Sequence, residues 1–225
     1  MNILVTGKNS FLFQSLLERG IFENDSLIQF EYGIDYTNID EIIHFGSPSH
    51  DKDFEFRDSM AISMIDYTTQ ITEIAIANQC PIIFASTEGV YELETLKSIN
   101  YITNQNRYEL FKLVSEEYLT SFDVDVLLLR IPRVYDKERS VGLVGKLLDN
   151  QVDENEMDNT VTFINKTQFI DWFIDTRKEF YDNLESSRKF VNNLHLLGEY
   201  IGDDVTLKLK DVLHYLGLKN PKQPK

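Results

Sequence analysis

The chain of 225 residues is 42% hydrophobic, which is enough for one domain with a real core or for one domain with a small appendage. Its formal net charge of −15 is spread along the sequence, which argues against nucleic acid or an anionic membrane as a partner but not against a small anionic ligand. The single cysteine, Cys80, excludes an internal disulfide, and no apolar run approaches the roughly 18 residues of a membrane span. Because the N-terminus lacks a signal-peptide pattern, we expect a cytoplasmic protein.

Strands and helices alternate steadily through the first part of the chain. Strands are expected at 1–6, 26–32, 39–45, from 82 to 87, and at 124–131; helices are expected at 11–19, 59–78 and 104–120. Only about eight residues separate Glu31 from the strand after it, which is too few for a full helix and strand, so one sheet element is expected to be deleted.

The pattern loosens beyond residue 136. We expect a helix at 142–148, an acidic loop at 149–158, a strand at 161–164, a helix at 169–184, a strand at 190–197 and a helix at 206–216. The alternation before it predicts an α/β fold with a Rossmann-like, doubly wound parallel sheet that is shortened. We therefore expect a dinucleotide-binding domain at 1–136 and a small C-terminal substrate-binding lobe at 137–225.

Tyr108 and Lys112 are the leading candidates for catalysis. They stand four residues apart in a predicted helix, so both side chains point to one face. The strand before them delivers Ser86 and Thr87 to its carboxyl end, which is where open α/β sheets bind ligands. The same spacing recurs at Tyr215 in the fraying last helix, where we interpret it as coincidence.

Other polar residues have simpler explanations. His44 lies in an apolar strand and is expected to be a core or near-core histidine. The histidines show no metal-ligand spacing with carboxylates or with cysteine, so no metal site is expected. Arg130 and Arg133 follow a strand into the expected cleft, where a diphosphate contact and a structural ion pair are equally good interpretations.

Five motifs in this order resemble the extended short-chain dehydrogenase/reductases, the NAD-dependent epimerase/dehydratase family that works on nucleotide sugars. They are ILVTG at 3–7 with Phe11, IIHFG at 42–46, FASTEGVY at 84–91, Tyr108 to Lys112, and LLRIPRVY at 128–135. The resemblance covers about the first 136 residues.

The resemblance implies roles for individual residues. Tyr108 would be the acid/base, Lys112 would hold the nicotinamide ribose and lower the phenol pKa, and Thr87 would bind the reacting oxygen. Contacts to NAD are implied for Gly7, Ser10, Phe11, Leu12, Glu31, Phe45, Gly46 and Lys112. Substrate contacts are implied for Ser86, Glu88, Arg130 and Arg133. The carboxylate of Glu31 would favour NAD over NADP because it would repel a 2′-phosphate.

The sequence departs from the family at two places. Ser10 and Phe13 replace the second and third glycines of the phosphate-binding turn, so a side chain stands where backbone should approach the pyrophosphate, and a large ring stands where helix and strand should pack closely. Gly89 follows Glu88 where dehydratases have a base, which disfavours sugar 4,6-dehydration.

The resemblance therefore implies an NAD-dependent nucleotide-sugar epimerase or keto-sugar reductase. The alternative is a catalytically impaired relative that serves as a nucleotide- or protein-binding module, which the altered glycine turn and the trimmed sheet suggest. The family commonly dimerises through two helices that correspond to 59–78 and 104–120, so a homodimer is expected.

Overall fold

The computed structural model describes residues 1–47, 58–91, 107–136, 142–187, 194–199 and 205–217. It divides into two compact units, the first formed by residues 1–131 and 170–200 and the second by 132–169 and 201–225. The division differs from the expected boundary at residue 136. Residues 170–187 of the long helix at 166–187 lie in the first unit, together with the strand at 195–199, because that strand pairs with the parallel sheet.

The first unit is built on a six-stranded sheet in the order β2-β1-β3-β4-β5-β8. Its strands are β1 (Asn2–Thr6), β2 (Ser26–Gln29), β3 (Glu41–His44), β4 (Ile82–Thr87), β5 (Val126–Ile131) and β8 (His195–Glu199). Every neighbouring pair is parallel. Residues 30–40 hold no strand or helix, so β2 is the edge strand, as the short connection predicted. The predicted Rossmann-like sheet is confirmed.

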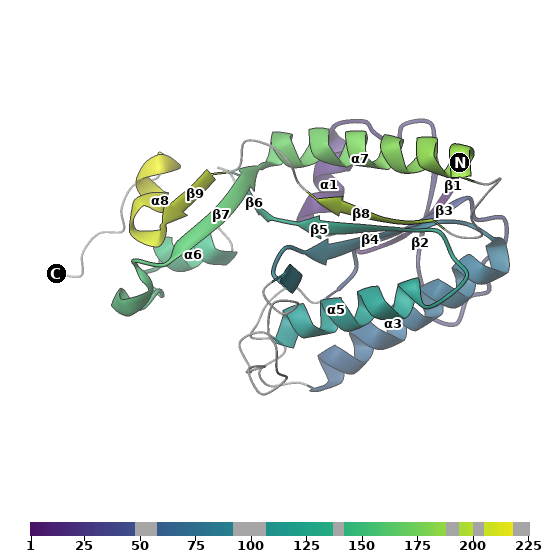
Figure 1. The fold of residues 1–225 in the computed structure, drawn as a ribbon, viewed down its shortest axis with the longest axis horizontal. Helices are drawn as coiled ribbons and strands as arrows, with labels where there is room; N and C mark the ends of the chain where they lie inside the picture. The colour runs from purple at the N-terminus through teal and green to yellow at the C-terminus, as the bar shows by residue number, and fades with distance from the viewer. Residues whose placement is uncertain (48–57, 92–106, 137–141, 188–193, 200–204, 218–225) are drawn as a thin grey trace. The chain divides into compact units, whose positions relative to one another are not determined.

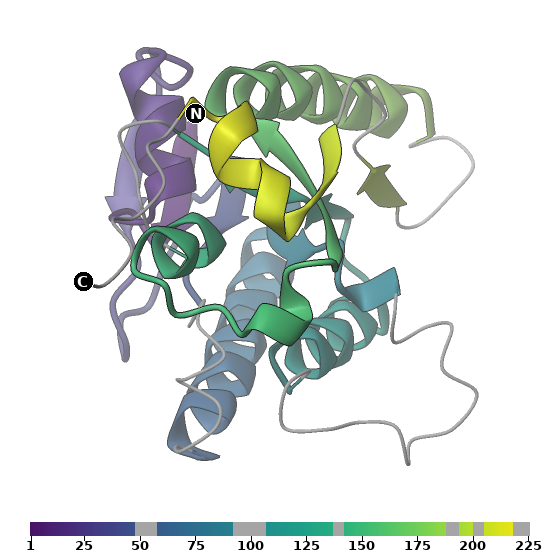
Figure 2. The same cartoon turned by 90° about the vertical axis from the view of Figure 1, so that its left-hand side faces the viewer.

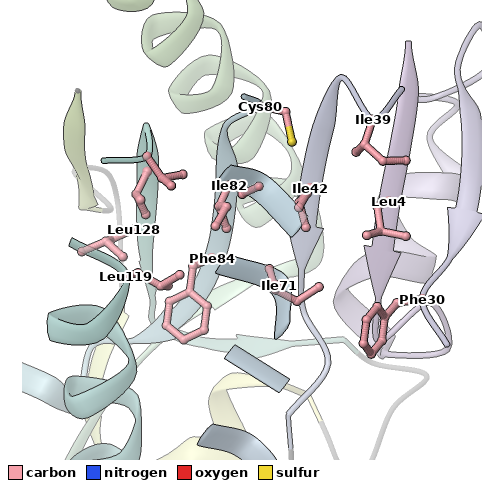
Figure 3. Close-up of a cluster of buried hydrophobic side chains, with 13 residues drawn as sticks. Leu4, Phe30, Ile39, Ile42, Ile71, Cys80, Ile82, Phe84, Leu119 and Leu128 are labelled. Carbon is pink, nitrogen blue, oxygen red and sulfur yellow. The ribbon is translucent and has the colours of Figure 1, made fainter. Parts of the chain in front are cut away.

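Helices cover both faces of this sheet (Figure 1). One face carries α1 (Phe11–Glu18) and α7 (Lys166–Ser187), and the other carries α3 (Asp58–Asn78) and α5 (Arg107–Thr120). Helices α3 and α5 contact each other and run side by side in both views (Figure 2). Residues buried between these two helices and the sheet form one core cluster (Figure 3), which includes Ile42, Phe84 and Leu128 from three strands and Ile71 and Leu119 from the helices.

The opposite face has an aromatic core and a buried ion pair. Phe45 at the end of β3 packs edge-on against Phe173 of α7, with 6.1 Å between ring centroids. Arg177 of α7 donates two hydrogen bonds to the Glu41 carboxylate, with N···O distances of 2.9 and 2.7 Å, and Glu41 is fully buried. A carboxylate in this position needs a paired cation, so the ion pair fastens α7 to the sheet.

The second unit contains a three-stranded sheet in the order β6-β7-β9. Its elements are β6 (Arg133–Tyr135), α6 (Gly142–Leu148), η3 (Glu154–Glu156), β7 (Thr160–Asn165), β9 (Val205–Lys208) and α8 (Leu209–Tyr215). The helix expected at 206–216 is wrong in its first part, because Thr206 to Lys208 form an antiparallel strand against β7. Thr162 and Thr206 share a hydroxyl hydrogen bond of 2.8 Å across this pair.

Candidate functional site

There is no room for a side chain at Gly7, where β1 ends beside β3. Gly7 has φ +69°, and a Cβ added to it would lie 2.5 Å from the amide nitrogen of Gly46. The Gly46 N–H in turn donates to Thr6 Oγ1 at 2.8 Å. Because β2 lies on one side of β1 and β3 to β5 lie on the other, this contact marks the point where strand order reverses, the usual ligand crevice of such sheets.

The turn after Gly7 carries Ser10 and Phe13 where the family that the sequence resembles has glycines. Ser10 is the N-cap of α1, with φ −66° and ψ 146°, and its Oγ accepts a hydrogen bond from the Phe13 N–H at 3.2 Å. An ordinary serine backbone therefore suffices there. The Phe13 ring is fully buried and stacks on Phe22 with 5.5 Å between centroids, so it fills the layer between α1 and the sheet. The Ser10 hydroxyl thus caps one of the N–H groups at the start of α1, and the Phe13 ring is turned into the core. Phe11 and Leu12, half-buried, begin α1.

The Lys112 ammonium lies at the end of β4, with the ring of Tyr108 from the same helix beside it. The Lys112 ammonium donates to the Ala85 carbonyl oxygen at 2.6 Å and lies 4.6 Å from the centre of the Phe84 ring. It is 5.8 Å from the centre of the Tyr108 ring, which is half-buried. Lys112 itself is only 2% exposed, and this burial lowers its pKa to about 7, although the nearby Glu116 carboxylate opposes the shift.

His44 is the core histidine that the sequence indicated. Its Nδ1 shares a 2.6 Å hydrogen bond with Thr6 Oγ1. Burial, and then the charge of Lys112, lower the His44 pKa to about 3, so the ring is neutral at physiological pH. Its Nε2 is buried and has no hydrogen-bond partner among the described residues, and the same holds for Ser86 Oγ.

Ser86 and Thr87 end β4 next to the last residues of β5. Ser86 is buried and pairs in register with Arg130, and Thr87 pairs with Ile131. Thr87 Oγ1 accepts a 3.4 Å hydrogen bond from the Gly89 N–H and is half-buried. The polar residues expected at this end of the strand are therefore present there. The Glu88 N–H, beyond the strand, donates to the Ile131 carbonyl oxygen at 3.2 Å.

Arg130 forms the structural ion pair, one of its two interpretations. Its guanidinium donates to both carboxylate oxygens of Glu116, the shortest contact being 2.8 Å, and it lies 4.5 Å from the centre of the Tyr91 ring. The Tyr91 hydroxyl donates to Glu199 Oε1 at 2.6 Å, and burial together with this carboxylate raises the Tyr91 pKa. Glu116 was not among the residues predicted from the sequence. Its position one turn after Lys112 on the same helix face was the available signal.

The remaining candidates are dispersed. Glu31 is exposed just beyond β2, and its N–H donates to the Tyr36 hydroxyl at 2.7 Å. Arg133 is exposed and belongs to the second unit.

Within the described ranges, no group of three or more His, Cys, Asp or Glu side chains could hold a metal ion. Nor, in the same ranges, is any helix long and apolar enough to cross a bilayer.

Solved structures similar to this chain include UDP-sugar epimerases and complexes with NAD and a UDP-sugar. A structure described as UDP-galactose 4-epimerase has a TM-score of 0.67 and 16% identity and covers 99% of this chain and 85% of its own. UDP-glucose 4-epimerase from Bifidobacterium longum, in complex with NAD⁺ and UDP, has a TM-score of 0.63 and 14% identity, covering 98% and 85%. MoeE5 in complex with UDP-glucuronic acid and NAD reaches 0.70 with 15% identity, covering 98% and 84%.

Sequence comparisons add nothing to this likeness. No protein-family model matches the chain, and no curated protein matches it significantly. At 14–16% identity the structural likeness establishes the fold alone. The chain thus shares the fold of NAD-dependent UDP-sugar epimerases and dehydratases, which are the family that its motifs resemble.

Proposed function

We propose that this protein is an NAD-dependent enzyme that epimerises a nucleotide-activated sugar or reduces a keto sugar. The observation that carries the proposal is the meeting of Tyr108 and Lys112 at the carboxyl end of β4, with Thr87 ending the same strand. A phenol, an ammonium and a hydroxyl at one strand end are the groups needed to move a proton on and off a sugar oxygen.

Tyr108 is the proposed acid/base. An unperturbed tyrosine has a pKa near 10 and is a poor base at neutral pH, so it needs a neighbouring cation to stabilise the phenolate. Lys112 supplies that charge from 5.8 Å, measured between its ammonium and the ring centre. The Lys112 ammonium is fixed by its hydrogen bond to Ala85, so the cation is held in place before any ligand arrives. Thr87 would orient the sugar oxygen.

The turn at Gly7 is the proposed place for the dinucleotide. A Cβ at Gly7 would collide with backbone, and the Phe13 ring lies in the core. The Ser10 hydroxyl already accepts from the Phe13 N–H, so the remaining N–H groups at the start of α1 are the ones proposed to face the pyrophosphate. We infer that Gly7, Ser10, Phe11, Leu12, Phe45 and Gly46 would contact NAD, with Glu31 at the adenosine ribose and Lys112 at the nicotinamide ribose. When bound, NAD supplies the hydride acceptor and donor that the protein lacks.

The substrate class rests on the fold and on the motifs. The neighbours named above include complexes with NAD and UDP or a UDP-sugar, which favours a nucleotide sugar here. Ser86 and Glu88 are the proposed substrate contacts beside Thr87, together with Arg133. Arg130 is the weaker candidate because its guanidinium is already bound to Glu116. Gly89 beside Glu88 disfavours 4,6-dehydration. We assign the substrate lobe to residues of the second unit.

The test combines cofactor binding with turnover. Calorimetric titration with NAD should give saturable binding. Incubation with NAD and UDP-glucose, UDP-galactose or one of their N-acetylated forms should give an epimer that chromatography separates from the substrate. Tyr108→Phe should lose about 10²-fold or more of the turnover while it still binds NAD, because only proton transfer is removed. Tyr215→Phe is the matched control and should keep full activity. An unchanged rate in Tyr108→Phe would remove the tyrosine from the mechanism, and no NAD binding at millimolar concentration would favour the non-catalytic alternative.

A further inference from the structure

The face of α5 that carries the proposed catalytic pair continues for one more turn. Lys112 and Glu116 stand four residues apart, so they are neighbours on one side of the helix. They are 2% and 3% exposed, so both side chains lie in the layer between α5 and the sheet. A lysine and a glutamate are rarely buried unless they are paired. Because Glu116 is buried, its carboxylate is not solvated and needs a partner in the protein.

The Glu116 carboxylate forms an ion pair with Arg130, a cation that comes from the sheet. Arg130 of β5 donates to it from Nη2 at 2.8 Å and from Nε at 3.3 Å, and this guanidinium is 7% exposed. The Arg130 guanidinium also lies 4.5 Å from the Tyr91 ring centre, and Tyr91 is tied to Glu199 by a 2.6 Å hydrogen bond. Arg130 is thus fixed by two contacts, and the carboxylate is fixed with it.

A buried ammonium loses its proton readily unless an anion offsets its desolvation. The groups around Lys112 are mostly neutral: the Ala85 carbonyl, the Phe84 ring, the Tyr108 phenol and the neutral His44 ring. Glu109, three residues earlier on α5, lies against Gly89. Glu116 is the anion whose charge favours protonated Lys112, and the ion pair with Arg130 holds that anion in place.

We propose that Glu116, held in place by Arg130, is a positioning residue: its negative charge, one helical turn from Lys112 in the same buried layer, favours the protonated form of the Lys112 ammonium at the end of β4. The inference rests on the proposed function only for its consequence, which is that a larger share of Lys112 is charged beside Tyr108 at neutral pH. The protonation of Lys112 is itself a property of the protein without ligands. It can be measured whether or not the protein turns over a sugar.

The test is an NMR titration of ¹³Cε-lysine-labelled protein without cofactor or substrate. Ordinary lysines titrate near pH 10.4, so a lysine titrating far below that is resolved, and its absence in Lys112→Met assigns it. In Glu116→Gln the midpoint of this signal should fall by roughly 1 pH unit, because the substitution removes a buried opposite charge that lies one helical turn from Lys112. In Glu116→Asp, which keeps the charge, the midpoint should return most of the way to that of the unsubstituted protein.

Folding of the variants is checked by circular dichroism. If Glu116→Gln does not fold, Glu116→Gln combined with Arg130→Gln leaves no unpaired buried charge and carries the same test, with a smaller fall expected. A folded variant whose Lys112 midpoint equals that of the unsubstituted protein would overturn the proposal and leave Glu116 and Arg130 as a purely structural pair. If the midpoint falls but no sugar is turned over, the positioning role stands and the proposed function does not.

Discussion

Gly7 and Gly46 approach each other so closely that a Cβ on Gly7 would lie 2.5 Å from the Gly46 amide nitrogen. This contact brings the ends of β1 and β3 together at the point where strand order reverses. Only one glycine of the family turn is therefore required by the local geometry. The other two places are occupied by Ser10, which caps α1, and Phe13, which packs in the core.

Gly7→Ala should destabilise the fold and abolish NAD binding. The positive φ of Gly7 costs a non-glycine residue about 1–2 kcal/mol, and the collision with backbone adds to this cost. Gly33→Ala is the matched control, since Gly33 has φ +75° but nothing within 4 Å of an added Cβ. Chemical denaturation of both variants measures the difference. Equal losses of unfolding free energy would show that the contact with Gly46 does not matter.

Lys112 should make stability rise with pH. Its pKa is about 7 in the folded protein against an ordinary value of 10.5, so between these values the unfolded chain binds more protons than the folded one. The free energy of unfolding should therefore increase as pH rises from about 7 towards 10.5, and the cost of burying the charge remains below 7. Urea denaturation at several pH values measures the slope. Lys112→Met should reduce the slope in this window, and an identical slope in both proteins would contradict a depressed lysine pKa.

Much of the first unit could be predicted from the sequence because its strands are continuous apolar runs. Residues 82–84 and 126–129 are buried in adjacent strands, and the helical period of α1 fixed its range within one residue. In the second unit, the helix expected at 142–148 is observed with the same bounds as α6. These elements depend on local periodicity, which is visible without any knowledge of what each element packs against.

The remaining features depend on distant partners. The alternation in Thr206 to Lys208 also fits a helix, and only pairing with β7 decides for a strand. Strand β6 has three residues and offers no period to detect. The sequence predicts that Arg130 lies near the site but leaves both a diphosphate contact and an ion pair open. It does not reveal that the Arg130 guanidinium is bound to Glu116. The local pattern thus puts Tyr108 and Lys112, the proposed catalytic pair, on one helix face, whereas long-range contacts decide what Arg130 and Glu116 bind.

Glu31 should make the protein prefer NAD to NADP. Its carboxylate is exposed just beyond β2, where a 2′-phosphate on the adenosine ribose would meet a like charge. Glu31→Ser removes this repulsion. The ratio of the dissociation constant for NADP to that for NAD should therefore fall by roughly tenfold, which corresponds to about 1.4 kcal/mol. Calorimetric titration with each cofactor measures the ratio. Glu23→Ser, at another exposed position in the chain, should leave it unchanged; the same ratio in Glu31→Ser would exclude the carboxylate as the determinant.

The Glu41–Arg177 pair should be essential for stability. Arg177→Met leaves the fully buried Glu41 carboxylate without its cation, which typically costs about 3–5 kcal/mol of unfolding free energy. Arg177→Met combined with Glu41→Leu should recover much of that loss, because no buried charge remains unpaired. Lys210→Met, which breaks the fully exposed pair with Asp158, is the surface control and should change stability little. Chemical denaturation that finds the single and double Arg177 variants equally unstable would place the cost in lost packing instead of charge burial.

Helices α3 and α5 should form the interface of a homodimer. Both present a large apolar side chain to solvent, Ile76 being 45% and Val114 42% exposed, and burying such side chains against a second copy is favourable. Light scattering coupled to size-exclusion chromatography should therefore give twice the chain mass of 26.3 kDa. Val114→Glu places a charge on this surface and should shift the equilibrium towards monomer, whereas Ile174→Glu, at an equally exposed apolar position on α7, should not. A monomer at all concentrations, or equal dissociation by both substitutions, would contradict an interface through α3 and α5.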